Sequence, residues 1–319
     1  MTEKKINFPG EIILEITNAC NLRCRYCHFH SLQAVRRRKI GYLPRNIWEK
    51  VLRELEEQKD AVTLMTHGAG EPLLHPDLLE ILQRARRIPN LKLGFMCNGM
   101  LLNDEWSRRL VELQVDFIAF SIDGTDPVTH DFFRHKANLS RIEQNVFSLI
   151  REKERQGSAL PQLSFNMVSY PEIEHQVPGY VNKWLPYACG VNVSRFRPVG
   201  SRRLWNGAEP LEFRPCPLLY RQMVIGADGR VGLCCEDINL EVQAGSIPGD
   251  SIKTIWNHSP VLGKYRRHHE NGDVKGLALC RDCHIWAGNI PITDQEVIIE
   301  GVRARLTTTH AYQAYQKIF

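Results

Sequence analysis

The stretch Cys20-Asn21-Leu22-Arg23-Cys24-Arg25-Tyr26-Cys27 holds three cysteines in the spacing CxxxCxxC. It directly follows the apolar run 11–17, which predicts a short buried strand. Three thiolates this close together can hold three corners of one metal centre, and iron–sulfur clusters are bound at such spacings. A tetrahedral zinc site needs four ligands, and nearby only His28 or His30 could complete one. The stretch therefore favours a 4Fe–4S cluster with one iron left open for a non-protein ligand.

Length and composition describe an ordinary globular protein. The chain has 319 residues, a formal net charge of +5 and ten cysteines. The first ten residues contain no apolar core of a secretory signal, and no apolar run has membrane-spanning length. In a large chain without a signal, many cysteines indicate metal sites in a reducing compartment. We therefore expect a cytoplasmic protein with no membrane and no nucleic-acid partner.

Apolar runs and helical patterns alternate along the first 200 residues. This alternation predicts a parallel sheet with helical crossovers, and each polar motif falls where a strand ends, as in the active site of an α/β barrel. The expected strands are 11–17, 61–66, 91–97, 116–122, 162–169 and 191–196; the expected helices are 44–58, 76–87, 104–113 with Asp104 as its cap, 140–156 and 173–185.

CxxxCxxC after a first strand, with the aromatic Tyr26 before the last cysteine, resembles the radical S-adenosylmethionine (SAM) superfamily. The resemblance implies an α/β fold, a partial (β/α)6 TIM-like barrel, in a domain of residues 1–199. It implies Cys20, Cys24 and Cys27 as ligands of a 4Fe–4S cluster whose open iron binds SAM. Reductive cleavage of SAM would then give a 5′-deoxyadenosyl radical that abstracts a substrate hydrogen.

The same resemblance assigns the cofactor-binding residues. Gly68-Ala69-Gly70-Glu71-Pro72 is similar to the family's GGEP motif, which holds the SAM amino group, with Ala69 in place of the first glycine. For each of the other polar candidates taken alone, helix capping or turn chemistry is the more frequent explanation. Their shared position at strand ends favours the site. The further candidates are Tyr26, Asn98, Ser121, Asp123, Arg134 and Asn166.

A second set of cysteines follows residue 199. Residues 200–215 lack periodicity and predict a linker. Residues 224–227 and 231–234 predict a hairpin through the turn Asp228-Gly229. A hairpin and a CxxC loop can bring distant cysteines together into a four-ligand site. The cysteines of this set are Cys216, Cys234, Cys235, Cys280 and Cys283.

This second region resembles the SPASM/Twitch extension of radical SAM enzymes, expected at 216–290. The resemblance implies one auxiliary 4Fe–4S cluster, bound by Cys216, Cys234, Cys280 and Cys283. Cys235 could replace Cys234, because neighbours on a strand point to opposite faces. A structural zinc site is the alternative for four thiolates. For the tail 291–319 we expect a helix packed on the rest of the protein.

Two further features have simple explanations. The cationic run 36–39 is typical of a solvated loop, and contact with an acidic substrate or a phosphate is the alternative. Cys97 and Cys189 belong to neither cluster motif, and we expect both to pack in the core. Cys97 lies at the end of the expected strand 91–97 and faces the expected radical site, where a thiol could also donate a hydrogen atom.

Resemblance to single-cluster SPASM/Twitch enzymes such as aminocyclitol dehydrogenases implies the reaction. We expect oxidation of a secondary alcohol in a small aminocyclitol or sugar, as in natural product biosynthesis, with the auxiliary cluster accepting an electron. Glu236 would be the catalytic carboxylate, and Arg197 (or Arg195) would pair with substrate or a neighbouring carboxylate. A surface salt bridge is the alternative for Glu236 and Arg197. The expected partners are a small-molecule substrate and a flavodoxin or ferredoxin-type reductant. The first strand begins close to residue 1, which suggests that no peptide-recognition domain precedes the barrel.

Two other functions remain open. One is a SPASM-type peptide maturase that crosslinks or epimerises a ribosomal peptide with a separate leader-binding partner. The other is a non-catalytic zinc-binding scaffold.

Overall fold

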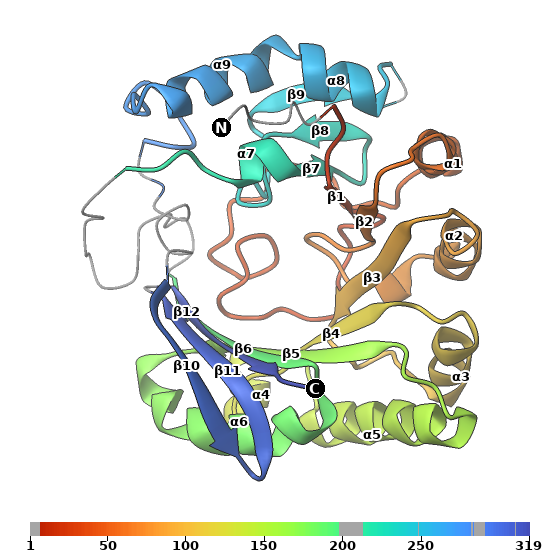
Figure 1. Ribbon diagram of the computed structural model, residues 1–319, viewed down its shortest axis with the longest axis vertical. Helices are drawn as coiled ribbons and strands as arrows, with labels where there is room; N and C mark the ends of the chain where they lie inside the picture. The colour runs from red at the N-terminus through yellow and green to blue at the C-terminus, as the bar shows by residue number, and fades with distance from the viewer. Residues whose placement is uncertain (1–6, 198–212, 248, 282, 284–290, 310) are drawn as a thin grey trace. The chain divides into compact units, whose positions relative to one another are not determined.

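The computed structural model describes residues 7–197, 213–247, 249–281, 283, 291–309 and 311–319 (Figure 1). The chain forms two compact units. The first unit comprises residues 1–20, 36–94 and 211–286, and the second comprises residues 21–35, 95–210 and 287–319. Residues 200–212 of the expected linker lie outside the described residues.

The first unit is built on a mixed sheet. Its strands are β1 (Glu11–Leu14), β2 (Val62–Met65), the first half of β3 (Leu91–Cys97), β7 (Gln222–Ile225), β8 (Arg230–Gly232) and β9 (Gln243–Ser246). β1 lies between β2 and β7 and is parallel to both, whereas β8 and β9 follow β7 in antiparallel order. The turn at Asp228-Gly229 has φ of +81° at the glycine, which confirms the predicted hairpin. The second cysteine region is therefore joined directly to the first strand of the chain.

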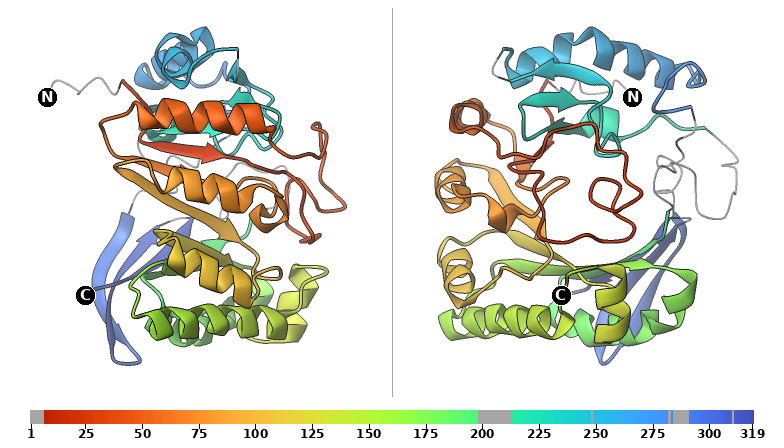
Figure 2. Two further views of the ribbon diagram at one scale, coloured as in Figure 1. Left: turned by 90° about the vertical axis from the view of Figure 1, so that its right-hand side faces the viewer. Right: turned by 180° about the vertical axis from the view of Figure 1, so that it is seen from behind.

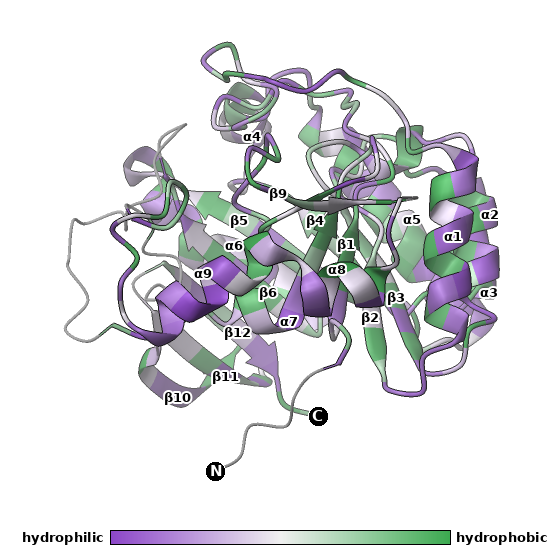
Figure 3. Ribbon diagram, turned by 90° about the horizontal axis from the view of Figure 1, so that it is seen from above, coloured by the Kyte–Doolittle hydropathy of each residue, from purple (hydrophilic) through white to green (hydrophobic). Residues whose placement is uncertain are grey.

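Helices pack against this sheet through apolar stripes. α1 (Arg45–Glu56) and α2 (Leu78–Ala85) lie side by side along the strands in Figure 2, and α1 buries Trp48, Val51 and Leu55, spaced three or four residues apart. The other helical segments are η1 (Pro72–Leu74), α7 (Leu218–Arg221), α8 (Ile252–His258) and α9 (Pro260–Glu270). Figure 3 shows hydrophobic residues along β2 and β3 and hydrophilic residues over much of α9.

The second unit continues the alternation of strands and helices. β4 (Phe117–Ser121), β5 (Gln162–Ser169) and β6 (Gly190–Arg195) are parallel neighbours. Their register pairs Ser121 with Asn166 and Asn166 with Asn192, so one polar residue from each strand stands in a single row. The helices are α3 (Asp104–Glu112), α4 (Pro127–Phe133), α5 (Leu139–Gln156), η2 (Pro171–Gln176), α6 (Val177–Trp184) and η3 (Leu185–Tyr187).

Local capping chemistry defines these helices. The Asn138 side chain accepts a hydrogen bond from the backbone N–H of Arg141 at the start of α5, and Gly157, with φ of +60°, ends the helix. At α3 the predicted cap is wrong. Asn103 is the cap, and its side chain accepts from the N–H of Trp106, whereas Asp104 is already the first helical residue. The predicted helix 173–185 begins instead as the 3-10 segment η2.

The C-terminal tail is not helical, so that prediction is wrong. It forms three antiparallel strands, β10 (Pro291–Ile299), β11 (Val302–Thr309) and β12 (Tyr312–Lys317), and β12 pairs with β6. Glu300 and Gly301 both have positive φ, +48° and +76°, as a two-residue hairpin turn requires. Because β12 covers the edge of β6, the tail adds residues to the sheet that carries the polar row. Among the described residues, no helix has the length and apolar character that crossing a membrane requires.

Candidate active site

All of the cysteine motif except Cys20 belongs to the second unit. The backbone N–H groups of Phe29 and His30 both point at the Cys27 sulfur, at 3.4 and 3.2 Å. Hydrogen bonds to ligand sulfurs are among the features by which a protein tunes an iron–sulfur cluster. The backbone N–H groups of Arg23 and Arg25 donate to the chain that leaves α4, at His135 and Phe133. Within the motif, the N–H of Cys27 donates to the carbonyl of Cys24, which closes a turn between these two cysteines.

The loop after β2 packs so tightly that two of its glycines, Gly68 and Gly70, have no room for a side chain. A Cβ atom on Gly70 would lie 2.4 Å from the carbonyl oxygen of Ala19, and one on Gly68 would lie 2.5 Å from Cγ of Glu15. Glu71 is buried; its N–H donates to the carbonyl of Ala19, and its carboxylate caps η1 through the N–H of Leu73. The GAGEP loop is therefore packed directly on the chain that enters the cysteine motif.

In the second unit, a buried ion pair organises the end of β4. Asp123 is completely buried, and one of its oxygens lies 2.8 Å from Nε of Arg134. The N–H of Val168 also donates to the carboxylate, at 2.8 Å. Burial alone would lower the pKa of Arg134, but the Asp123 carboxylate raises it well above its usual value. Asp123 thus fixes a permanently charged guanidinium, which stacks 5.3 Å above the ring of Tyr26.

A cavity of about 480 Å³ lies over β4, β5 and β6 in the second unit. The row Ser121–Asn166–Asn192 lines it, with Nδ2 of Asn192 donating to Oδ1 of Asn166 at 2.9 Å. The Tyr26 hydroxyl is buried and has no hydrogen-bond partner among the described residues, so a ligand here could satisfy it. The lining residues are Tyr26, Met96, Ser121, Arg134, Asn166, Met167, Val168, Asn192, Ser194 and Tyr312.

The structure thus brings together four of the predicted SAM-binding residues, Tyr26, Ser121, Arg134 and Asn166, in one cavity. Asn98 has a different contact, because its Nδ2 donates to Oδ1 of Asn21 inside the cysteine motif at 2.8 Å. The neighbouring Cys97 is 3% exposed, in keeping with core packing.

The second cysteine set lies in the first unit. The N–H of Cys216 donates to Nδ1 of His269, and the turn at Cys283 closes on the carbonyl of Cys280. Burial, and next the neighbouring Cys235 thiol, raise the pKa of Cys234; Glu236 and Cys283 add to the effect. Within the described residues, no three Cys, His, Asp or Glu side chains are drawn together tightly enough to enclose an ion. The four thiols nevertheless provide the donor set that an iron–sulfur cluster uses.

The two predicted catalytic residues occupy loops. Glu236 follows the cysteine pair and is half-buried, and its carboxylate helps raise the pKa of the Cys216 thiol, after the larger effect of burial. Arg197 follows β6 in the second unit and is also half-buried. Their catalytic roles remain predictions.

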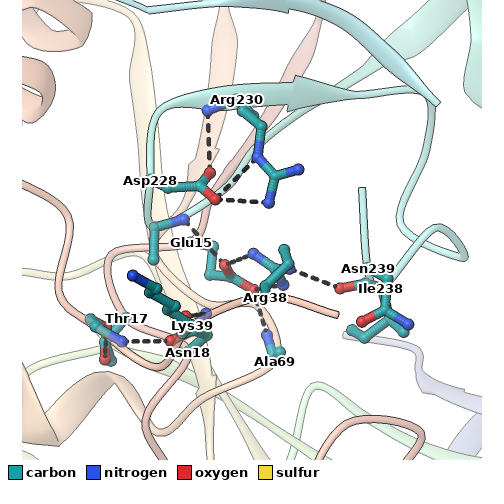
Figure 4. A network of polar contacts seen from close by, with 12 residues as sticks. Glu15, Thr17, Asn18, Arg38, Lys39, Ala69, Asp228, Arg230, Ile238 and Asn239 are labelled. Carbon is teal, nitrogen blue, oxygen red and sulfur yellow. Dashed lines mark hydrogen bonds and ion pairs between the residues drawn. The ribbon is translucent and has the colours of Figure 1, made fainter. Parts of the chain in front are cut away.

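Several site residues escaped the sequence analysis. Asn192 and Ser194 alternate along β6, a pattern that could have placed both on one face of the strand. Tyr312 was hidden because the tail was expected to be helical. Glu15 and Arg38 form a buried ion pair, shown in Figure 4. Arg38 belongs to the cationic run that was expected to be solvated, yet it is 6% exposed and pairs with the Glu15 carboxylate.

Comparison with known families agrees with this arrangement. Residues 14–155 match the radical SAM superfamily, and residues 216–284 match the SPASM iron–sulfur cluster-binding domain. The chain therefore carries a radical SAM TIM-like core followed by a SPASM domain. SAM and a 4Fe–4S cluster are its cofactors, and the SPASM domain adds auxiliary iron–sulfur binding.

Curated relatives are diverse. A tungsten-containing aldehyde ferredoxin oxidoreductase cofactor-modifying protein of Pyrococcus furiosus is 26% identical over 52% of this chain and 46% of its own length. The PqqA peptide cyclase of Gluconobacter oxydans is 29% identical over 81% of this chain and 79% of its own length. The chain spans about half the length of the first curated relatives that it matches.

Solved structures share the fold. BtrN in complex with AdoMet and 2-DOIA superposes with a TM-score of 0.57 and 18% identity, over 86% of this chain and 92% of BtrN. Streptococcus suis SuiB bound to the precursor peptide SuiA gives a TM-score of 0.63 and 14% identity, over 82% of this chain and 67% of SuiB. At these identities the likeness concerns the fold alone.

Proposed function

We propose that this protein is a radical SAM dehydrogenase that oxidises a secondary alcohol of a small aminocyclitol or sugar, with one auxiliary 4Fe–4S cluster as electron acceptor. The observation that carries the proposal is the cavity over β4–β6. Beyond the positions proposed for SAM, its wall presents the uncharged hydrogen-bonding groups of Asn192, Ser194 and Tyr312. Groups of this kind match the hydroxyls of a polyol, which both donate and accept hydrogen bonds.

The residues divide into two roles in this proposal. Tyr26, Ser121, Arg134 and Asn166 hold SAM, which supplies a radical that removes a hydrogen atom from the substrate. Asn192, Ser194 and Tyr312 orient the substrate hydroxyls, and Asn166 links the two groups through its hydrogen bond with Asn192. Ketone formation releases the hydroxyl proton, and Glu236 is proposed to accept it. The reductant is proposed to be a flavodoxin or ferredoxin in the cytoplasm, where the ten cysteines, all free thiols here, stay reduced.

The test is a product assay with anaerobically reconstituted protein, SAM and a chemical reductant. The substrates are a panel of aminocyclitols and sugars that includes 2-DOIA, and both 5′-deoxyadenosine and ketone are measured. Asn192→Ala should raise KM at least tenfold, because an amide that bonds a substrate hydroxyl is lost. Tyr315→Ala, on the same strand as Tyr312 but outside the cavity lining, is the control and should leave KM unchanged. Ketone formation with no member of the panel would argue against the proposal.

The second candidate is a peptide maturase. Two findings favour it: the PqqA peptide cyclase matches most of this chain, and the fold also superposes on SuiB bound to a precursor peptide. A pulldown from the native host that recovers a short precursor peptide, together with a mass change in that peptide when SAM is added, would favour this candidate over the dehydrogenase.

A further inference from the structure

A buried ion pair in the first unit joins loops that serve different cofactors. Arg38 and Glu15 form two parallel hydrogen bonds, at 2.5 and 2.9 Å, and their side chains are only 1% and 4% exposed. Glu15 comes directly after β1, and Arg38 lies in the loop that returns from the cysteine motif to α1. We refer to the two residues as the Glu15–Arg38 clamp.

The remaining hydrogen bonds of the clamp reach the loop expected to hold SAM. The second oxygen of Glu15 accepts a hydrogen bond from the backbone N–H of Ala69 at 2.9 Å (Figure 4). Gly68 packs so closely on Glu15 that a side chain at that position would overlap its Cγ. The GAGEP loop is therefore held to the Glu15 carboxylate by both a hydrogen bond and shape.

The clamp also reaches the SPASM domain. The first oxygen of Glu15 accepts from the N–H of Ala227, in the turn after β7, at 2.9 Å. Nε of Arg38 donates to the carbonyl of Ile238 at 3.0 Å, in the loop that begins at the auxiliary ligand Cys234. The neighbouring Arg37 adds a backbone contact, its N–H donating to Oδ1 of Asn239 at 3.0 Å. Two cofactor loops thus share one carboxylate–guanidinium pair.

Stability alone is a weak reason for such a pair. Removing two charges from water costs several kcal/mol per ion, so a buried ion pair often contributes no more to stability than apolar residues of the same size. What the pair provides is geometry, because a bidentate carboxylate–guanidinium contact fixes both partners in one relative orientation. The two loops also form walls of one small cavity of about 190 Å³, lined by the clamp together with Gly68, Ala69, Cys235 and Asp237.

We propose that the Glu15–Arg38 clamp is a positioning element that couples the GAGEP loop to the auxiliary-cluster loop 234–238. A structural change at one cofactor site would then alter the other site. The proposal rests on the cofactor roles assigned to these loops. It does not depend on the identity of the substrate, because its test requires none.

The test compares reconstituted wild-type protein with Arg38→Met. Two quantities are measured: the SAM dissociation constant, from the change that SAM causes in the electron paramagnetic resonance (EPR) spectrum of its cluster, and the midpoint potential of the auxiliary cluster. Arg38→Met should weaken SAM binding at least tenfold, because the Glu15 carboxylate loses the partner that orients it towards Ala69. It should also lower the potential, because a positive charge beside the cluster loop is lost. Arg37→Met, which removes the neighbouring exposed charge, is the control and should change neither quantity.

Two further variants keep the test decisive. Arg38→Lys retains the charge but not the fork geometry, so it should restore the potential but not the SAM affinity. If Arg38→Met does not fold, Arg38→Met with Glu15→Gln removes both charges and leaves no unpaired carboxylate. The proposal is overturned if the folded variant, with a full complement of iron, keeps wild-type SAM affinity and auxiliary potential and only melts at a lower temperature.

Discussion

Protonation of His130 should make the free energy of unfolding depend on pH. The ring is completely buried, the N–H of Asp123 donates to its Nδ1, and its Nε2 has no partner among the described residues. Burial, and next the charge of Arg134, lower the pKa of His130 from 6.5 to about 4. The unfolded chain therefore binds more protons than the folded chain between pH 6.5 and 4, so stability is lost as the pH falls through this window.

The size of this effect follows from the shift. A pKa shift of this size corresponds to about 3 kcal/mol of unfolding free energy, at about 1.4 kcal/mol for each unit of pKa shift. Denaturant unfolding of the wild type and of His130→Gln at pH 7, 5.5 and 4.5 would check it. The variant should show a smaller loss of unfolding free energy between pH 7 and 4.5. Parallel losses in the two proteins would assign the acid sensitivity to other groups.

Gly70 and Gly41 allow the same substitution, glycine to alanine, to be compared at a crowded and at an open position. A Cβ atom on Gly70 would meet the backbone carbonyls of Ala19 and Thr17 at 2.4 and 2.5 Å, whereas nothing lies within 4 Å of one on Gly41. Gly70→Ala should lower the free energy of unfolding by about 2–3 kcal/mol, because rigid backbone must move. It should also lower iron retention, since Ala19 adjoins Cys20. Gly41→Ala should stay within about 0.5 kcal/mol of wild type. Equal losses in the two variants would contradict the packing argument.

Among whole elements, α3 tests the corrected helix cap. The Asn103 side chain accepts a hydrogen bond from the N–H of Trp106 at 2.9 Å. Asn103→Ala should therefore cost about 1 kcal/mol of unfolding free energy. Asp104→Asn keeps a side-chain oxygen for its partner Ser148 and should cost less than about 0.5 kcal/mol. Chemical denaturation measures both changes, and an unchanged free energy of unfolding in Asn103→Ala would contradict Asn103 as the cap.

The sequence analysis succeeded for elements whose signals are local. The hairpin at Asp228-Gly229 and the strands β3 and β5 were predicted because turn residues and apolar runs mark them directly. The tail strands were missed because β10 is exposed on nearly all of its residues, so alternation of burial gives no guide. The pairing of β12 with β6 joins residues more than 100 positions apart, and no local pattern encodes it. The positive-φ turn at Glu300-Gly301 marks only the hairpin between β10 and β11.

For the whole molecule, cysteine spacing predicted both iron–sulfur domains, because each ligand set needs a fixed number of thiols in chain order. It did not predict that β7 would join β1 or that Arg38 would be buried, since a solvated and a buried arginine look alike in a sequence. The number of clusters is the property of the whole chain that most constrains its chemistry. Two 4Fe–4S clusters require about eight iron atoms per chain.

Iron analysis after anaerobic reconstitution tests that number. Wild type should hold about eight irons, and about four should remain in either Cys20/Cys24/Cys27→Ala or Cys216/Cys234/Cys280/Cys283→Ala. Cys189→Ala, outside both ligand sets, should keep about eight. Single Cys234→Ala and Cys235→Ala variants decide between the two neighbours, because only the true ligand should lower auxiliary iron. About four irons in wild type and none in the first variant would remove the proposed electron acceptor, and zinc at both sites would instead favour a scaffold.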